Sequence, residues 1–248
     1  YTLGTIGALL IAWLSWLGIR KRNYKSTAGT LQGWASAHVY LGLSLLVVGT
    51  LHAGFQVGLN VHTVAYVLMI IVIFTGIYGI AAYLKYPRQM SDNRGNNTLE
   101  QMLKKLEELN KQALRTADKC QPEISRLVTS AINLQVYGGG FWQQIMGNDK
   151  SQCEIHANGA LVITGNADQE VIIRHLSELI AEADDETERQ HLSHLLQSIL
   201  DIRILLTRLQ KDIKIRARLK VWLYLHIPVT IALLFALVAH IISVFIYW

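Results

Sequence analysis

In the stretch His38-Val-Tyr-Leu-Gly-Leu-Ser-Leu-Leu-Val-Val-Gly-Thr-Leu-His52, two histidines lie fourteen positions apart within an apolar run. A second stretch, His226-Ile-Pro-Val-Thr-Ile-Ala-Leu-Leu-Phe-Ala-Leu-Val-Ala-His240, repeats that spacing. At about 100° per residue, fourteen steps return to nearly the same face of a helix, and the rise is roughly 21 Å. Each stretch is therefore predicted to be a helix that presents one imidazole near each surface of a membrane.

The two histidine pairs also lie at matched depths in their apolar runs. His38 comes seven residues after Leu31, and His226 comes six residues after Lys220. Ionisable side chains inside a membrane are costly and usually mark a functional site. One membrane histidine could simply hydrogen-bond a neighbouring helix, but four at equal spacing on two helices are hard to explain by packing. They are predicted to hold two metal centres stacked across a bilayer.

The composition is that of a chain lying partly within a membrane. Of 248 residues, 51% are hydrophobic and 17% are charged, and mean hydropathy is +0.27, whereas soluble domains carry roughly 25% charged residues. In such a chain the net charge of +5 first indicates topology, and no nucleic-acid partner is expected. Two cysteines make neither a disulfide scaffold nor a complete zinc site.

Four apolar runs predict an all-α membrane protein with four transmembrane helices, at residues 3–19, 31–59, 61–84 and 221–248. The expected domains are residues 1–85 with three membrane helices, an insertion at 86–219, and the fourth membrane helix at 220–248. Cations cluster at 20–25, 85–88 and 211–220, on one side of the predicted membrane. Because positive loops stay inside, the insertion is expected on the cytoplasmic side of a bacterial inner membrane.

The insertion is predicted to be mostly helical, after a polar linker at 90–97. Thr98 and Gln101 form a capping-box pattern at the start of one helix, and Pro122 is suited to open another. A short strand is expected at 160–164, and Asp168 is expected to cap a helix ending near Ala183. The last helix, from Glu186, meets no breaker before Pro228 and is expected to run straight into the fourth membrane span.

The kind of metal centre follows from the ligand arrangement. Zinc usually takes four ligands in one place, whereas two imidazoles per centre suit a six-coordinate haem that transfers electrons. Without a Cys-x-x-Cys-His motif, the two haems would be non-covalent haem b. Gly42 and Gly49 lie on the histidine face, where they could make room for a flat macrocycle or simply allow helices to pack.

Four other basic residues near the runs are further candidates. Arg218 and Lys220, with Arg216, could pair with haem propionates, although topology and anionic lipid explain these cations equally well. His62 opens the third apolar run, where a capping or snorkelling role is favoured over ligation.

On these residues, the chain resembles the di-haem membrane cytochromes b, especially the cytochrome b subunit of quinol:cytochrome c oxidoreductases. In that family the second and fourth helices each carry two histidines with thirteen residues between them, and a four-helix bundle holds two b haems. The resemblance covers mainly residues 31–84 and 221–248. It implies that the haem ligands are His38, His52, His226 and His240, and that the haem-facing glycines are Gly42 and Gly49.

The chain also departs from that family. It lacks the Pro-Glu-Trp-Tyr motif of quinol oxidation, it carries a large insertion before the fourth helix, and its charge bias reverses the expected orientation. The expected function is electron transfer across a membrane within a larger redox complex, between a quinone pool and partners such as cytochrome c or iron–sulfur proteins. Two alternatives remain: a transmembrane ferric or quinone reductase, and a non-redox membrane anchor or signalling protein.

Overall fold

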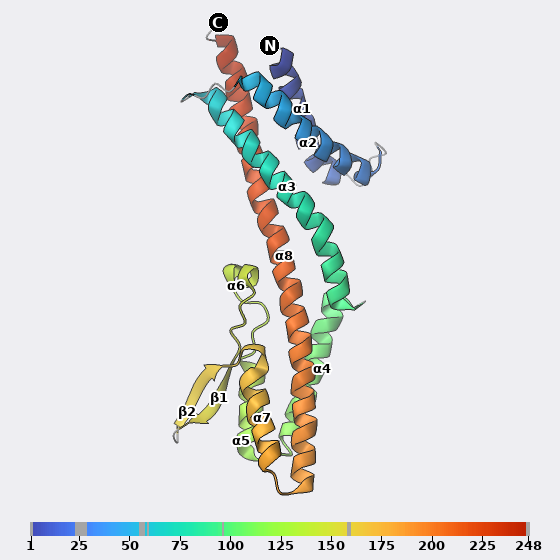
Figure 1. Ribbon diagram of the computed structural model, residues 1–248, viewed down its shortest axis with the longest axis vertical. Helices are drawn as coiled ribbons and strands as arrows, with labels where there is room; N and C mark the ends of the chain where they lie inside the picture. Colours follow the sequence, from blue (N-terminus) through green and yellow to red (C-terminus); the bar gives the residue numbers. More distant parts are fainter. Residues whose placement is uncertain are drawn as a thin grey trace. The chain divides into compact units, whose positions relative to one another are not determined.

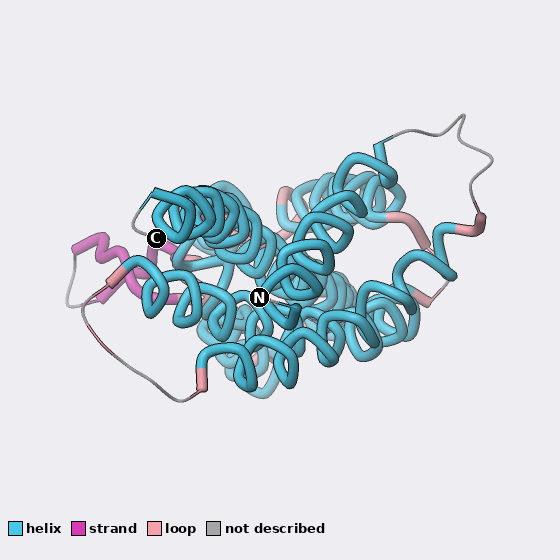
Figure 2. Tube along the Cα trace, turned by 90° about the horizontal axis from the view of Figure 1, so that it is seen from above, coloured by secondary structure: helices cyan, strands magenta, loops and turns pink. Residues whose placement is uncertain are grey.

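The structure is a computed structural model that describes residues 2–22, 29–54, 58, 60–95, 97–157 and 160–246. It is mainly helical (Figures 1 and 2) and divides into two compact units, residues 1–84 with 219–248, and residues 85–218. The helices are α1 (Thr2–Arg22), α2 (Leu31–Ala53), α3 (Val61–Arg94), α4 (Leu99–Ala117), α5 (Pro122–Asn133), α6 (Phe141–Met146), α7 (Glu170–Glu182) and α8 (Glu186–Ile246), and the strands are β1 (Gln152–Ala157) and β2 (Ala160–Gly165).

Four helices, α1, α2, α3 and α8, are long and apolar enough to cross a membrane. Large apolar side chains on them are exposed, among them Leu84 (77%), Phe235 (74%) and Phe245 (80%). Such a surface is costly in water and suits contact with lipid. Parts of the predicted runs lie outside the described residues, namely 23–28 of the first basic loop, 55–57 and 59 of the second run, and 247–248 of the fourth.

The core of the first unit draws on all four of these helices. Leu45 of α2 and Leu233 of α8 are each 3% exposed, and each lies midway between the two histidines of its own helix. Met69 of α3 and Ile11 of α1 join them. This set, completed by Leu14 and Ile73, is called the central apolar layer below. It separates the levels of the histidines along α2 and α8.

The C-terminal ends of α2 and α3 differ from what the sequence suggested. The second apolar run extends to residue 59, but α2 ends at Ala53, because Gly54 takes a left-handed conformation with φ 58°, which glycine adopts readily. The linker predicted from residue 90 is instead helical to Arg94, with Pro87 inside α3. Side-chain bonds hold this extension: Asn93 Nδ2 donates to the carbonyl of Arg208 at 2.7 Å.

An ion-pair network lies in the second unit, between the end of α3 and α8. Asp212 is fully buried, and its carboxylate accepts two bonds from Arg94, from Nε at 2.6 Å and from a terminal nitrogen at 2.9 Å. Arg216 Nε donates a third bond at 2.9 Å. A buried carboxylate needs such partners, because desolvation of an unpaired charge costs several kcal/mol.

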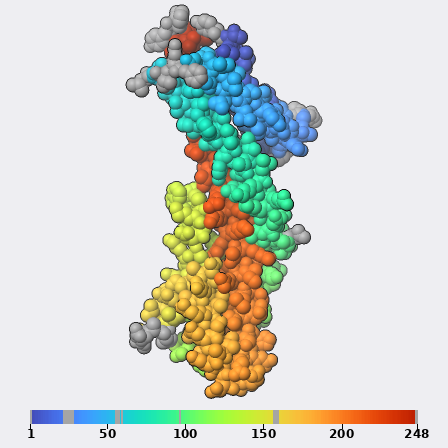
Figure 3. All heavy atoms as spheres, viewed as in Figure 1, coloured from blue at the N-terminus to red at the C-terminus, as the bar shows by residue number. Residues whose placement is uncertain are grey.

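The second unit is a helical domain with its own core. The hydrophobic faces of α4, α5, α7 and the first part of α8 meet around fully buried side chains such as Val128, Leu195 and Leu209. In Figure 3, α7 and this part of α8, in gold and orange, form a continuous packed surface. The predicted capping box is confirmed: Gln101 N donates to Thr98 Oγ1 at 3.1 Å, and Gln101 Oε1 accepts from Thr98 N at 2.7 Å.

The region of residues 152–182 contains one element that sequence reasoning missed and one wrong prediction. The predicted strand, β2, pairs antiparallel with β1, which was not expected. Asp168 does not cap α7; it lies in a 3₁₀ turn with φ 51°. Asn166 makes the hydrogen bonds at the start of α7 instead. Its Oδ1 accepts from Ile172 N at 3.4 Å, and its Nδ2 donates to Gln169 Oε1 at 2.9 Å.

Candidate metal and haem sites

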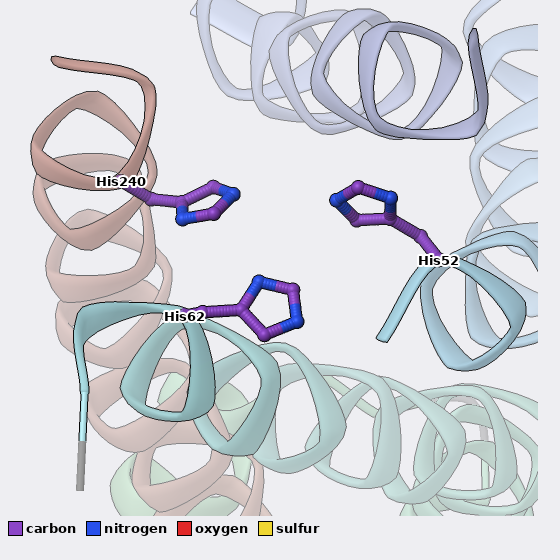
Figure 4. Close-up of side chains that lie close together, drawn as sticks. All are labelled: His52, His62 and His240. Carbon is purple, nitrogen blue, oxygen red and sulfur yellow. The ribbon is translucent and has the colours of Figure 1, made fainter. Parts of the chain in front are cut away.

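Three histidines from three helices converge at one end of the first unit. His52 comes from α2, His62 from α3 and His240 from α8, and their rings point into the space between these helices (Figure 4). One ligand nitrogen of each lies within 4.8 Å of the others. Ring centroids are 4.9 Å apart for His62 and His240, 5.5 Å for His52 and His62, and 6.3 Å for His52 and His240. We call this set the outer histidine cluster.

The end of α2 and the start of α3 bring His52 and His62 together. His52 lies in the last turn of α2, and His62 is the second residue of α3. The start of α3 is fixed by Asn60, whose Oδ1 accepts from Thr63 N at 2.8 Å. On the other side, a Cβ added at Gly4 of α1 would lie 2.8 Å from the ring of His52, so glycine is needed for α1 to approach the cluster this closely.

His62 is the functional candidate that the sequence interpretation set aside. Its position at the start of an apolar run suggested a cap, whereas the structure places it against two predicted ligands. The available signal was its distance of ten residues from His52 across a short uncharged connection, since helices joined by a short loop run antiparallel and bring such residues to one level.

The other two predicted ligands, His38 and His226, have one ring nitrogen fixed by a hydrogen bond. Nδ1 of His38 lies 3.1 Å from the carbonyl oxygen of Leu14, which can only accept. Nδ1 of His226 lies 2.8 Å from Thr75 Oγ1, whose own proton is donated to the carbonyl of Val72 at 2.8 Å. Both Nδ1 atoms are therefore donors, which leaves the lone pair of each Nε2 free to bind a metal.

We call His38 of α2 and His226 of α8 the inner histidine pair. Trp222 packs beside His226, with ring centroids 5.6 Å apart and planes tilted by 35°. A Cβ at Gly79 would lie 2.2 Å from the Trp222 ring, so α3 and α8 approach closely here. The indole Nε1 of Trp222 is buried and makes no hydrogen bond to any described residue.

The surroundings of the inner histidine pair can be compared with what a haem needs. A free Nε2 on each of His38 and His226 supplies two axial nitrogens, and an unpartnered buried donor on Trp222 could bond a carboxylate of a ligand. A Cβ added at Gly42 would meet nothing within 4 Å, so there is open space beside it. The inner pair therefore fits the group that the sequence implied.

Four predicted residues have other surroundings. A Cβ at Gly49 would lie 2.6 Å from Met69, which is the helix-packing role that the sequence left open. On α8, Arg218 is half-buried and Lys220 is exposed, eight and six residues before His226. Arg216 is already engaged by Asp212, so pairing with another anion would require it to leave that carboxylate.

Comparisons with protein-family models, with curated proteins and with solved structures find no match to this chain.

Proposed function

We propose that this chain transfers electrons across a membrane through two b haems, one held by His38 and His226 and the other by His52 and His240. The observation that carries the proposal is the inner pair, in which second hydrogen bonds fix both tautomers with Nε2 free. Metal-ligating histidines almost always have such a second partner, which orients the ring and raises its basicity. A haem with two imidazole ligands supplies one-electron chemistry with both axial positions filled.

The chain's own residues position the two centres. Fourteen residues of helix separate the ligands of each pair along α2 and along α8, a rise of roughly 21 Å, against a hydrocarbon core about 30 Å thick. Electrons would enter and leave through a quinone or redox partners such as cytochrome c or iron–sulfur proteins. Membrane lipid would cover the exposed apolar faces of the spans. Arg218 and Lys220, close to the inner pair along α8, are the proposed propionate partners.

The purified full-length chain, made with an adequate haem supply, tests the cofactor directly. We expect a low-spin b-type spectrum and two haems per chain in a pyridine haemochrome assay. A colourless protein that does not take up added haem would contradict the proposal and favour the non-redox anchor.

Transfer itself is tested in proteoliposomes with a trapped electron acceptor. External reductant is expected to reduce both haems and then the internal acceptor, in the presence of a quinone or co-purified partners. Reduction of both haems without any reduction of the acceptor under these conditions would contradict the conduit. Liposomes without protein give the rate at which the external reductant reduces the trapped acceptor without the chain.

We propose a bacterial inner membrane as the location, with the second unit on the cytoplasmic side and the outer histidine cluster near the opposite face. The support is the charge distribution, because cations lie beside three of the four spans on one side and the α2–α3 connection carries none.

Introduced cysteines test this topology. In intact cells, an impermeant maleimide is expected to label Thr2→Cys, at the start of α1, but not Glu178→Cys, an exposed position on α7. Burial raises the pKa of the Cys120 thiol and of the Cys153 thiol, so both native cysteines react slowly and the unaltered chain gives a low background. Labelling of Glu178→Cys from outside would reverse the orientation.

A further inference from the structure

The outer histidine cluster has one imidazole more than a haem iron can use. A haem iron accepts two axial ligands, because the porphyrin fills its other four positions. At the inner level the described residues offer two histidines, but at the outer level they offer three. Moreover, a third ring nitrogen within 4.8 Å of the other two lies inside the area that a macrocycle between them would occupy.

The spacing of the three nitrogens is close to that of a mononuclear metal site. Histidine nitrogens bind zinc at about 2.0–2.1 Å, which places two tetrahedral ligand atoms about 3.3 Å apart. The observed nitrogens lie within 4.8 Å of one another, so small side-chain rotations would bring them to that separation. Such rotations are available, because the hydrogen bonds of the described residues include none to these three rings, unlike those of His38 and His226.

The burial of the cluster leaves room for a fourth ligand. His52 is exposed, and His62 and His240 are half-buried, so the protein does not enclose the rings. Three histidines with one open position for water is the arrangement of catalytic zinc sites. Neutral imidazole suits zinc, copper, nickel and iron, whereas calcium and magnesium prefer oxygen ligands.

We propose that His52, His62 and His240 bind one divalent first-row transition metal ion, of the Zn²⁺ or Cu²⁺ class, and that this ion and a haem exclude each other at the outer site. The ion takes one nitrogen from each ring and water in the fourth position. Because it needs His52 and His240, its binding removes both axial ligands of the proposed outer haem. Metal at the outer face would thus interrupt the electron path while leaving the inner pair intact.

The binding test uses the full chain in nanodiscs, purified haem-free and without a polyhistidine tag. Zn²⁺ is titrated in competition with a chromophoric chelator, and Cu²⁺ is examined by electron paramagnetic resonance. We expect one ion per chain and nitrogen hyperfine splitting from three imidazoles. His62→Ala is expected to weaken binding by on the order of 100-fold, since losing even a partner of a ligand costs 10- to 100-fold.

Two variants serve as controls. His194→Ala removes an exposed histidine of α8 in the other unit, and His38→Ala removes one from the inner pair, so neither is expected to change Zn²⁺ affinity. If the chain binds no ion, or if His62→Ala binds as tightly as the unaltered chain, the three-histidine site is wrong.

A competition experiment between Zn²⁺ and haem distinguishes failure of this proposal from failure of the proposed function. His62→Ala is expected to retain two haems, because it keeps both outer axial ligands, and Zn²⁺ is expected to lower outer haem uptake in the unaltered chain but not in this variant. Equal haem uptake with and without bound Zn²⁺ would overturn the mutual exclusion. Failure to bind any haem would contradict the proposed function, while the Zn²⁺ titration of the haem-free chain would still stand.

Discussion

His226→Ala is expected to lose the inner haem completely and keep the outer one, so haem content falls from two to one per chain. The variant removes one of the two proposed ligand nitrogens, and no described histidine is placed to replace it, because His52, His62 and His240 gather in the outer histidine cluster. The double variant His52→Ala with His62→Ala is expected to do the reverse, because His62 lies beside His52 in the outer histidine cluster and could take its place. Haem quantitation and redox titration of each variant give the result.

Thr75→Val is the matched control for this experiment. It keeps the ligand His226 and the side-chain volume but removes the oxygen that accepts the Nδ1 proton at 2.8 Å. Losing such a partner typically costs 10- to 100-fold in affinity, so this variant should bind the inner haem more weakly rather than not at all. Two haems with an unaltered spectrum in His226→Ala would show that the ligand assignment is wrong.

Asp212→Ala is expected to destabilise the second unit by about 3–5 kcal/mol, the usual cost of removing one partner from a buried ion pair. The aspartate is fully buried, and its loss leaves Arg94, with a side chain 19% exposed, without its carboxylate. The same change would loosen the end of α3 from α8. Thermal unfolding of the full chain, followed by circular dichroism and by protease sensitivity of the second unit, measures the effect.

Two companions isolate the cause of that loss. Asp201→Ala removes an exposed carboxylate from the same helix and is expected to change stability by no more than about 0.5 kcal/mol. The double variant Arg94→Met with Asp212→Leu replaces both charges by apolar groups and should recover much of the loss, since apolar replacement of a buried pair is often neutral. Equal melting temperatures for Asp212→Ala and Asp201→Ala would contradict the role assigned to Asp212.

The membrane helices could be predicted from sequence because their signal is local. Long uncharged runs predict spans, and Thr98 with Gln101 predicts a helix start within four residues. The continuous helix from Glu186 through Pro228 was also readable, because no breaker precedes the proline and α8 indeed runs to Ile246. These features depend on hydropathy and capping, which neighbouring residues determine.

The structural features that could not be predicted from the sequence depend on contacts between distant segments of the chain. The helical course of residues 90–94 rests on Arg94 meeting Asp212, more than one hundred positions later. β1 alternates weakly and becomes recognisable through its pairing with β2. The partners of the inner histidines, Leu14 and Thr75, come from two other helices, and no spacing rule links them to His38 and His226.

The central apolar layer has a consequence for energy conversion. The side chains of Leu45, Met69 and Leu233 carry no proton donor or acceptor, so in the proposed path an electron crossing this layer would gain no proton from them. Such a step would be electrogenic: it would work with or against the membrane potential, at about 2.3 kcal/mol per elementary charge for 100 mV across the full thickness. The direction of net flow would then respond to the energised state of the membrane as well as to the redox partners.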